Sequence, residues 1–413
     1  MTPSGDVLIL SKRGAGGIRQ IAPIVRAKGY RPVLVSSDVD DRNRPVCDAH
    51  LLVDWDRDEL PALVRAAEQA EVQPAAVVNM VEPLIPWQQD IAAHYRLPGG
   101  QPGMRVLASK LRVREALARL GYDRPRFTGG PAGKLSPESV DFYPAMVKPS
   151  QDSGASRLVR RADTPAELAD RLASVARDPQ EGPETEVVIE AFLPGTEFSI
   201  DGPVLDHRFH GLFVVEKLDH DDARHHDRGL LVSPPVHDYV SVGAAQIETA
   251  VSRLCRQLAL DSLWLHVEGR VEPGGDAALV EINPRPGGRI YRAAMRHRQQ
   301  IDSVEVAVEL ALGRRPAVTP KPTPDRLIGM FDLEAMELGT VRVETEPAEL
   351  LALPGVLDVR ISDGYPVTTL EQENMVVCTV LGGRDLAELR AVAERVAATV
   401  RFRIDPMPAP TSP

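Results

Sequence analysis

The sequence predicts a mixed α/β and α+β protein of 413 residues that divides into two or three packed units. Three observations lead to this prediction. Roughly the first hundred residues alternate strand-like and helix-like segments, which is typical of an open α/β domain. Two strand-like runs, 263–271 and 277–283, form a hairpin pattern in the second half. A proline-rich stretch at 314–324 then separates a closing α/β segment.

The first unit is predicted from the order of its segments. The strand-like and helix-like segments alternate as 6–10, 18–28, 32–35, 48–53, 59–69 and 75–78. The turn after the first strand contains Gly14 and Gly16, but Arg19 stands where a dinucleotide motif has its third glycine. Asp38 and Asp40 could hold a ribose, yet a tight turn or a loop lining a cleft explains the glycines better.

Glycine and proline mark the next boundary, at 98–103. Ser109 follows it and suits the N-cap of a helix that runs from Lys110 to Leu120 and ends at Gly121. We therefore expect the second unit to begin with this helix.

Charge and composition exclude several classes of function. The chain has 59 acidic and 48 basic residues, a net charge of −11, which argues against a protein that mainly binds nucleic-acid phosphates. Cys47, Cys255 and Cys378 lie far apart, so neither a disulfide framework nor a zinc site is supported, and we expect a cytoplasmic protein. No signal-like or membrane-spanning apolar stretch of roughly 18 to 20 residues occurs.

A loop rich in serine and glycine is the first candidate for binding an anion. It lies between two strand-like runs, one ending at Lys148 and one beginning at Arg157. Small residues let backbone N–H groups approach a phosphate, and the lysine adds a positive charge. Only seven of the 48 basic residues are lysines, which makes each lysine worth considering. Taken alone, an ordinary β-hairpin is the more frequent explanation of such a loop.

Two glutamates flank a proline-glycine turn further along. Glu190 ends a buried-type strand, and Glu197 opens the next one. Their carboxylates could accept hydrogen bonds from ribose hydroxyls or order a hinge. Two solvent-facing glutamates at a turn are an equally good explanation from these residues alone.

The hairpin of 263–283 carries the most information. If Gly274 and Gly275 form a two-residue primed turn, Glu268 lies opposite Glu281, and His266 lies opposite Asn283. The other face then pairs apolar or small residues, which makes the register self-consistent: Val267 with Ile282, Gly269 with Val280 and Val271 with Ala278.

Directly opposed carboxylates repel each other and should weaken a sheet, and a divalent cation between Glu268 and Glu281 removes this conflict. Carboxylate and amide oxygens, including that of Asn283, select Mg²⁺ or Mn²⁺ rather than zinc. The alternative is a longer turn, which would shift the register and separate the two carboxylates.

Arg285 follows the hairpin between two prolines, ahead of Gly287 and Gly288. The prolines limit the backbone around the arginine, and the glycines expose N–H groups. A guanidinium held beside a metal is what phosphoryl transfer requires, because charge spreads over the oxygens of the transferring group.

These motifs, in this order, resemble the ATP-grasp superfamily. The residues that carry the resemblance are Lys110, Arg114, Lys148 with its loop, Glu190, Glu197, Glu268, Glu281, Asn283 and Arg285. Over roughly residues 5–405, the chain is most similar to the carboxylate–amine ligases of the bacilysin-type L-amino acid ligase group.

The resemblance implies an ATP-grasp architecture with ATP held between two lobes. The implied divisions are an N-terminal α/β domain (1–107), a core (108–315, with lobes 108–190 and 191–315), a C-terminal ligase subdomain (316–405) and a flexible tail (406–413). The implied ATP contacts are Lys110, Lys148, Ser153, Gly154, Ala155, Ser156, Glu190, Ala191, Phe192, Leu193 and Glu197.

The resemblance also implies the remaining site residues. Two Mg²⁺ ions, or Mn²⁺, would bind Glu268, Glu281 and Asn283. Arg285 and His266 would be catalytic. The carboxylate and amine substrates, expected to be amino acids, would bind Glu82, Arg285, Gly287, Gly288 and Arg289.

The implied reaction joins a carboxylate to an amine. The γ-phosphate of ATP converts the carboxylate to an acylphosphate, the amine attacks it, and ADP and phosphate leave. We expect small-molecule partners, a homodimer, and no nucleic acid or membrane. An ATP-grasp carboxylase, a nucleotide-pathway ligase and a non-catalytic nucleotide-binding protein are the alternatives.

Two features depart from the family pattern. Arg289 is basic where relatives often carry a bulky or small residue, which would suit an acidic or unusual acyl substrate. Four histidines, His220, His225, His226 and His237, lie within 216–238. We expect this stretch to be a solvated loop rather than a cover of the active site.

Overall fold

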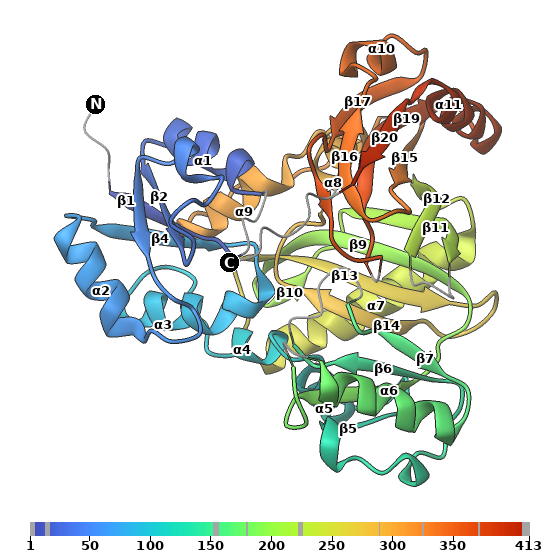
Figure 1. The fold of residues 1–413 in the computed structure, drawn as a ribbon, viewed down its shortest axis with the longest axis horizontal. Coiled ribbons are helices and arrows are strands. Elements are labelled where there is room, and N and C mark those ends of the chain that lie inside the picture. Colours follow the sequence, from blue (N-terminus) through green and yellow to red (C-terminus); the bar gives the residue numbers. More distant parts are fainter. Residues whose placement is uncertain are drawn as a thin grey trace.

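The computed structural model describes residues 5–12, 17–151, 157–178, 181–221, 226–288, 290–323, 326–370 and 372–406. They form four sheets with helices packed on them, which confirms the predicted mixed α/β and α+β class. Figure 1 shows an N-terminal unit beside a central sheet, a smaller sheet below and a C-terminal segment above. The described residues do not include Gly14, Gly16, Ser153, Gly154, Ala155, Ser156, His225 and Arg289.

The N-terminal unit is a parallel sheet in the order β3-β2-β1-β4. Its elements are β1 (Asp6–Leu10), α1 (Ile18–Ala27), β2 (Arg31–Ser36), β3 (Ala49–Leu52), α2 (Leu60–Gln69), β4 (Pro74–Asn79) and α3 (Ile85–Tyr95). Every residue of β1 is buried, as expected for a parallel strand covered by helices on both faces. The predicted alternation of strands and helices is confirmed.

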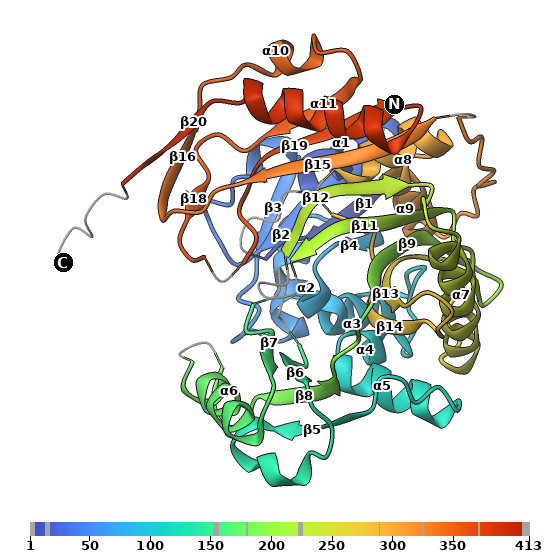
Figure 2. The same cartoon turned by 90° about the vertical axis from the view of Figure 1, so that its right-hand side faces the viewer.

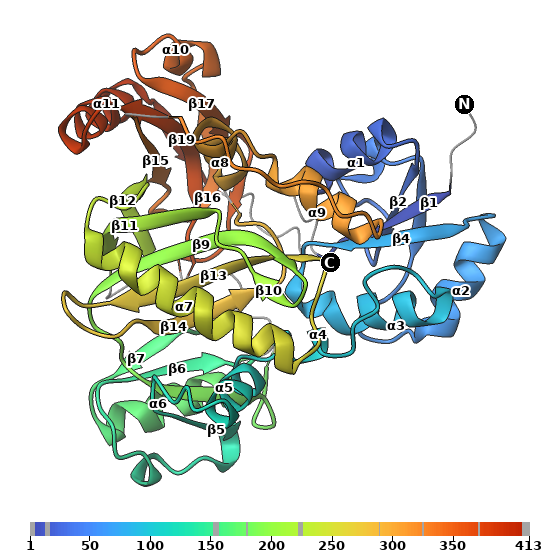
Figure 3. The same ribbon diagram turned by 180° about the vertical axis from the view of Figure 1, so that it is seen from behind.

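One face of this sheet is covered by a helix that comes much later in the chain. Val304 and Val308 of α9 (Ser303–Ala311) pack with Val7 and Ile9 of β1. Figure 3 shows α9 beside α1 and β4. The N-terminal sheet and the core therefore share buried apolar surface, and the predicted boundary at residue 107 stays a prediction.

The smaller sheet is antiparallel, in the order β5-β8-β6-β7. Its elements, with the helices beside it, are α4 (Met104–Leu107), α5 (Lys110–Arg119), β5 (Phe127–Pro131), β6 (Ala145–Pro149), β7 (Arg160–Ala162), α6 (Pro165–Arg177) and β8 (Glu186–Ala191). The predicted N-cap is confirmed, because Ser109 Oγ accepts a hydrogen bond from Arg112 N at 3.2 Å. The strand expected at Arg157 begins instead at Arg160, since Leu158 has a left-handed φ of 57° that a strand does not accommodate.

The central sheet has nine strands, in the order β14-β13-β9-β11-β12-β15-β19-β17, with β10 paired to β9. The strands are β9 (Thr196–Leu205), β10 (Arg208–Phe209), β11 (Phe213–Asp221), β12 (His226–Ser233), β13 (Leu263–Val271), β14 (Ala278–Asn283), β15 (Leu327–Glu334), β17 (Val356–Ile361) and β19 (Met375–Gly383). Figure 3 shows helix α7 (Asp238–Gln257) lying across β9, β13 and β14. This face is apolar, with Phe198, Ile247 and Val267 in one buried cluster.

The C-terminal segment extends the central sheet and also forms a separate three-stranded sheet in the order β18-β16-β20. Strands β15, β19 and β17 continue the central sheet past β12, and Figure 2 shows β12, β15 and β19 side by side. The remaining elements are α8 (Tyr291–Gln299), β16 (Gly339–Val343), α10 (Pro347–Leu351), β18 (Pro366–Val367), α11 (Leu386–Thr399) and β20 (Phe402–Asp405). Residue 316 lies in the connection between α9 and β15, and β15 pairs with β12 in the same sheet. The domain boundary predicted at this residue stays a prediction. Among the described residues, no helix has the length and hydrophobicity to cross a membrane.

Candidate active site

The candidate site lies on the polar face of the central sheet, opposite helix α7. Because side chains alternate along a strand, His266 and Glu268 of β13 point away from the apolar cluster that contains Val267. In register, Glu268 lies opposite Glu281 and His266 lies opposite Asn283. Both predicted pairs are confirmed, and the opposed carboxylates are a feature of the structure.

The predicted turn of this hairpin is wrong. Gly275 N donates to Glu272 O at 3.0 Å, and Gly274 has a φ of 75°, so the turn is built on Pro273 and Gly274, a pairing typical of a type II turn. The longer connection adds one residue on the β14 side. The register shifts after Glu268, and Gly269 and Arg270 pair with Leu279 and Ala278 instead of the predicted partners.

A cavity of about 400 Å³ opens between the central sheet, the smaller sheet and the N-terminal unit. It collects most of the residues that the sequence predicts for ATP, metal and substrate. Those that line it are Glu82, Lys110, Lys148, Glu190, Ala191, Phe192, Leu193, Glu197, His266, Glu268, Glu281, Asn283, Arg285 and Gly288. Ser153–Ser156 and Arg289 lie outside the described residues. The structure therefore shows where these side chains lie, while their roles in binding ATP, metal and substrate stay predictions.

Glu190 joins two cationic side chains on the small-lobe side of the cavity. Arg114 Nε donates to its Oε1 at 2.6 Å, and Lys148 Nζ donates to its Oε2 at 2.8 Å. Burial alone would raise the pKa of Glu190, but Arg114 and Lys148 outweigh it and lower the pKa to about 2. Lys148 is thereby held at the cavity wall, on the strand where the sequence places a phosphate contact.

The free energy of unfolding should fall at acidic pH because Glu190 becomes protonated. Because its folded-state pKa lies near 2 rather than its ordinary 4.5, Glu190 stabilises the fold above pH 4.5 and loses that contribution as the pH falls toward 2. The full contribution is about 3 kcal/mol. We expect Glu190→Gln to lower the free energy of unfolding in urea by about that amount at pH 7, and by less at pH 3.5.

The control for this titration is Glu184→Gln, which removes an exposed partner of Lys134. Exposed ion pairs contribute less than about 1 kcal/mol, so this variant should follow the wild type at every pH. A Glu190→Gln deficit that is the same at pH 7 and pH 3.5 would contradict the assignment.

Lys217 lies at the centre of a buried cluster of carboxylates that sequence reasoning missed. Its Nζ lies 2.6 Å from Glu197 Oε1, 2.9 Å from Glu268 Oε1 and 3.2 Å from Asp227 Oδ2. Burial would lower the pKa of Lys217, but Asp227, Glu197 and Glu268 raise it well above its usual value. The lysine therefore stays charged and compensates the acids on three strands.

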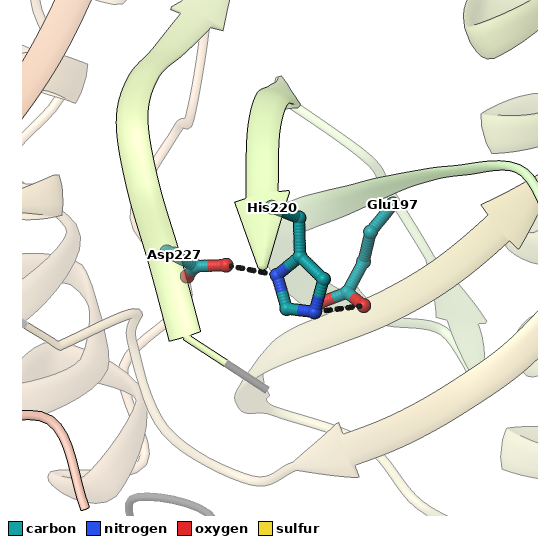
Figure 4. Close-up of side chains that lie close together, drawn as sticks. All are labelled: Glu197, His220 and Asp227. Carbon is teal, nitrogen blue, oxygen red and sulfur yellow. Dashed lines mark hydrogen bonds and ion pairs between the residues drawn. The ribbon is translucent and has the colours of Figure 1, made fainter. Parts of the chain in front are cut away.

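His220 belongs to the same cluster (Figure 4). Its Nδ1 lies 2.9 Å from Asp227 Oδ1, and its Nε2 lies 3.7 Å from Glu197 Oε2. Glu197, His220 and Asp227 are close enough together to hold a metal ion. The three side chains are already bonded to one another or to Lys217, and one ligand would be an imidazole rather than an oxygen donor, so we assign no metal here.

The prediction of a solvated loop over 216–238 is wrong for the described residues. Glu216 and Lys217 lie in β11, which pairs with β12 inside the central sheet, and both are buried. Their charges are compensated by partners from other strands, which is what permits burial. His220 lines the cavity, whereas His237 is about half exposed and bonds to Glu216 from the position just before α7.

Arg285 connects the core to the N-terminal unit. Its Nε pairs with a carboxylate oxygen of Glu82, which follows β4, and its Nη1 donates to Pro286 O at 3.1 Å. Burial would lower the pKa of Arg285, but Glu82 raises it, so the guanidinium stays charged. Two residues that the sequence assigns to substrate thus contact each other at one end of the cavity.

The donor set of Glu268, Glu281 and Asn283 fits a hard divalent cation. All three lie on adjacent strands and line the cavity with oxygen ligands. Burial would raise the pKa of each glutamate, but Lys217 lowers that of Glu268 and Lys110 lowers that of Glu281. Both carboxylates are therefore ionised, as metal ligands must be.

His266 is held on the same face by Asp201. Its Nδ1 lies 2.6 Å from Asp201 Oδ2, and its Nε2 lies 3.6 Å from Glu268 Oε1. Burial would lower the pKa of His266, but Asp201 and Glu268 raise it to about 9. Asp201, like Lys217, was not singled out from the sequence. The alternation from Glu197 through Ser199 to Asp201 was the available signal, because it places all three on the polar face.

Comparison with known sequences supports the resemblance to the ATP-grasp superfamily. Residues 141–293 match a family model described as an ATP-grasp domain. Carnosine synthase 1 of Gallus gallus is 26% identical over 362 residues, which cover 79% of this chain and 37% of that protein. The chain thus spans little more than a third of the length of this relative.

Comparison with solved structures shows the fold. The L-amino acid ligase from Bacillus licheniformis superposes with a TM-score of 0.79 at 19% identity, covering 98% of this chain and 100% of that one. A carboxyaminoimidazole ribonucleotide synthase from Aspergillus clavatus, complexed with ATP, superposes with a TM-score of 0.73 at 13% identity, covering 97% and 99%. Both likenesses extend over nearly the whole chain, so they include the N-terminal unit and the C-terminal segment.

Proposed function

We propose that this chain, an ATP-grasp protein, is an ATP-dependent ligase that joins a small-molecule carboxylate to an amine, with amino acids as substrates. One observation carries the proposal. A single cavity brings together Lys110 and Lys148, the carboxylates Glu268 and Glu281, and Arg285. These are the charges that an ATP-driven phosphoryl transfer needs.

The first step activates the carboxylate. A carboxylate oxygen attacks the γ-phosphorus of ATP, the bond from that phosphorus to the β–γ bridging oxygen breaks, and an acylphosphate and ADP result. Divalent metal held by Glu268, Glu281 and Asn283 would supply charge neutralisation at the phosphate oxygens. Arg285 would stabilise the charge of the transferring group, and its contact with Glu82 orients the guanidinium before substrate arrives.

The second step forms the amide. The amine lone pair attacks the acyl carbon, the bond from that carbon to the phosphate oxygen breaks, and the departing phosphate takes up the proton that the nitrogen loses. His266 lines the cavity opposite Asn283 and would contact the reacting groups. No enzyme nucleophile is required, which agrees with the burial of Cys255 and Cys378 away from this cavity.

The charge of the cavity favours substrates that carry both signs. Glu82 and Arg285 present opposite charges to each other at one end. A zwitterionic amino acid offers a carboxylate to the arginine and an ammonium to the glutamate, so it can bind beside the ion pair without leaving a buried charge unpaired. The likeness to an L-amino acid ligase and to a carnosine synthase supports the same substrate class.

An ATP-grasp carboxylase or nucleotide-pathway ligase is the second candidate, because a carboxyaminoimidazole ribonucleotide synthase shares the fold. A non-catalytic nucleotide-binding protein is the third. It has no need for the combined set of Glu268, Glu281, Asn283 and Arg285. The homodimer, the cytoplasmic location and the number of metal ions stay predictions.

The test is phosphate release from Mg·ATP across pairs of amino acids, with mass detection of the product. We expect ADP only with particular pairs, and a product lighter than the two substrates by one water. With the carboxylate labelled by ¹⁸O, one labelled oxygen should appear in the released phosphate, because the acylphosphate bridge oxygen leaves with it.

The outcomes separate the candidates. Turnover that requires bicarbonate would favour the carboxylase. Tight ATP binding without turnover for any carboxylate would favour the non-catalytic binder. Unlabelled phosphate alongside amide product would exclude an acylphosphate.

A further inference from the structure

We propose that Asp201 is a positioning residue of the ligase reaction, which fixes both the imidazole of His266 and the backbone amide of Gly287 at the wall of the cavity. This inference rests on the proposed function. Asp201 itself does not line the cavity, whereas His266 and the neighbouring Gly288 do. It would therefore act on the reaction only through the groups that it holds.

The carboxylate of Asp201 accepts three hydrogen bonds, two from side chains of β13 and one from the loop after Arg285. Its Oδ1 accepts from Trp264 Nε1 at 3.0 Å and from Gly287 N at 2.8 Å. Its Oδ2 lies 2.6 Å from His266 Nδ1. Asp201 is 2% exposed, so these contacts replace water at a buried acid.

The contact with His266 determines which ring nitrogen faces the reacting groups. A carboxylate can only accept, so Nδ1 carries the hydrogen in this bond. Nε2 is then left on the side of Glu268, 3.6 Å from its Oε1. The ring of Tyr291 packs edge-on against the imidazole with centroids 5.2 Å apart, which limits its rotation. Hydrogen bonding at one nitrogen is how proteins orient the other for chemistry.

The contact with Gly287 ties the loop that follows Arg285 to strand β9. A Cβ at position 287 would lie 2.8 Å from Tyr291 Cδ1 and 3.0 Å from Asp201 Oδ2, so only glycine allows this close approach. The N–H of Gly287 points at Asp201, and the next residue, Gly288, lines the cavity. One carboxylate thus sets the relative position of the histidine and the glycine loop.

Asp201→Asn distinguishes positioning from mere packing. The amide is close in size to the carboxylate, and its oxygen can still accept from Trp264 and Gly287. Its nitrogen, however, offers a hydrogen to His266 Nδ1, which can no longer donate. The imidazole must then carry its hydrogen on Nε2 or turn away, while the fold keeps most of its contacts.

We expect Asp201→Asn to lower kcat by about a hundredfold or more, while the KM for ATP changes by less than threefold. Asp6→Asn is the matched control, because Asp6 is also a buried carboxylate, but it accepts hydrogen bonds from Arg31 and Gln73 in the N-terminal unit and does not line the cavity. It should stay within twofold of wild type. In a His266→Ala background, Asp201→Asn should cause no further loss, because its effect passes through the imidazole.

A readout that needs no turnover is ¹⁵N NMR of the imidazole. The wild type should show a hydrogen-bonded Nδ1–H for His266, and Asp201→Asn should lose it. Additive losses of kcat in the double variant, a kcat within threefold of wild type, or an unchanged Nδ1–H signal would each overturn the proposal. If the wild type turns over no substrate, the proposed function fails, but the NMR signal still tests the contact.

If Asp201→Asn does not fold, His266→Asn tests whether turnover depends on the oriented imidazole. The asparagine nitrogen can occupy the place of Nδ1 and keep the bond to Asp201, while nothing replaces Nε2. We expect this variant to melt close to wild type and to lose turnover about a hundredfold. Full activity would show that the orientation of the ring does not matter, and would overturn the proposal.

Discussion

Replacing Glu281 by glutamine is expected to lower turnover by about a thousandfold, which corresponds to about 4 kcal/mol of transition-state stabilisation. Glu281 lies opposite Glu268 and also pairs with Lys110 at 2.8 Å. The amide keeps an oxygen that can accept from Lys110, so the change mainly removes a charged metal ligand. The measurements are phosphate release with saturating Mg·ATP and binding of Mn²⁺ followed by electron paramagnetic resonance.

The control for Glu281→Gln is Glu184→Gln, which removes the same charge from an exposed pair with Lys134. It should leave both turnover and Mn²⁺ binding unchanged. If Glu281→Gln binds Mn²⁺ as tightly as the wild type, the metal does not use the opposed carboxylates. The cluster of Glu197, His220 and Asp227 would then become the place to look.

The parts of the fold that could be predicted are those with strong local signals. Strand β13 runs over Leu263–Val271, as its alternation indicates. Helix α5 begins after the N-cap Ser109, because a serine before a helical pattern satisfies the first free N–H groups. The packing of α9 against β1 could not be predicted, since nothing in either segment specifies a partner so distant in the chain.

The hairpin shows how local and non-local information combine. The opposition of Glu268 and Glu281 follows from alternation, and it is correct. Two pairs of residues could occupy the centre of the turn, Pro273 with Gly274 or Gly274 with Gly275, and the prediction placed the second pair there. The bulge absorbs the difference before it reaches the carboxylates, so the pairing of Glu268 with Glu281 was predicted correctly from an incorrect turn.

Lys217 marks the limit of prediction from sequence. A stretch rich in charge is usually exposed, because a buried charge without partners is very unfavourable. Its partners Glu197, Glu268 and Asp227 come from three other strands, and only the order of the central sheet brings them together. Local composition therefore pointed to solvent, whereas the tertiary arrangement makes this lysine part of the cavity.

Arg285→Lys is expected to lower kcat by about a thousandfold while ATP still binds. The guanidinium of Arg285 contacts Glu82 through Nε and donates to Pro286 O through Nη1. These two contacts fix the orientation of its plane at the wall of the cavity. A lysine keeps the charge but has a single nitrogen, so it cannot hold Glu82 and also contact the transferring phosphoryl group from a fixed direction. Single-turnover phosphate release and nucleotide binding by calorimetry separate the two effects.

The matched control is Arg315→Lys, in an exposed arginine that pairs with Asp206 and Asp261. It should leave both kcat and nucleotide affinity unchanged, because a surface ion pair tolerates the loss of fork geometry. Glu82→Gln should also lower kcat, but by less than Arg285→Lys, since it weakens the contact that orients the guanidinium without removing the guanidinium. An Arg285→Lys enzyme with wild-type kcat would mean that this residue supplies only charge, and the orientation given by Glu82 would have no catalytic role.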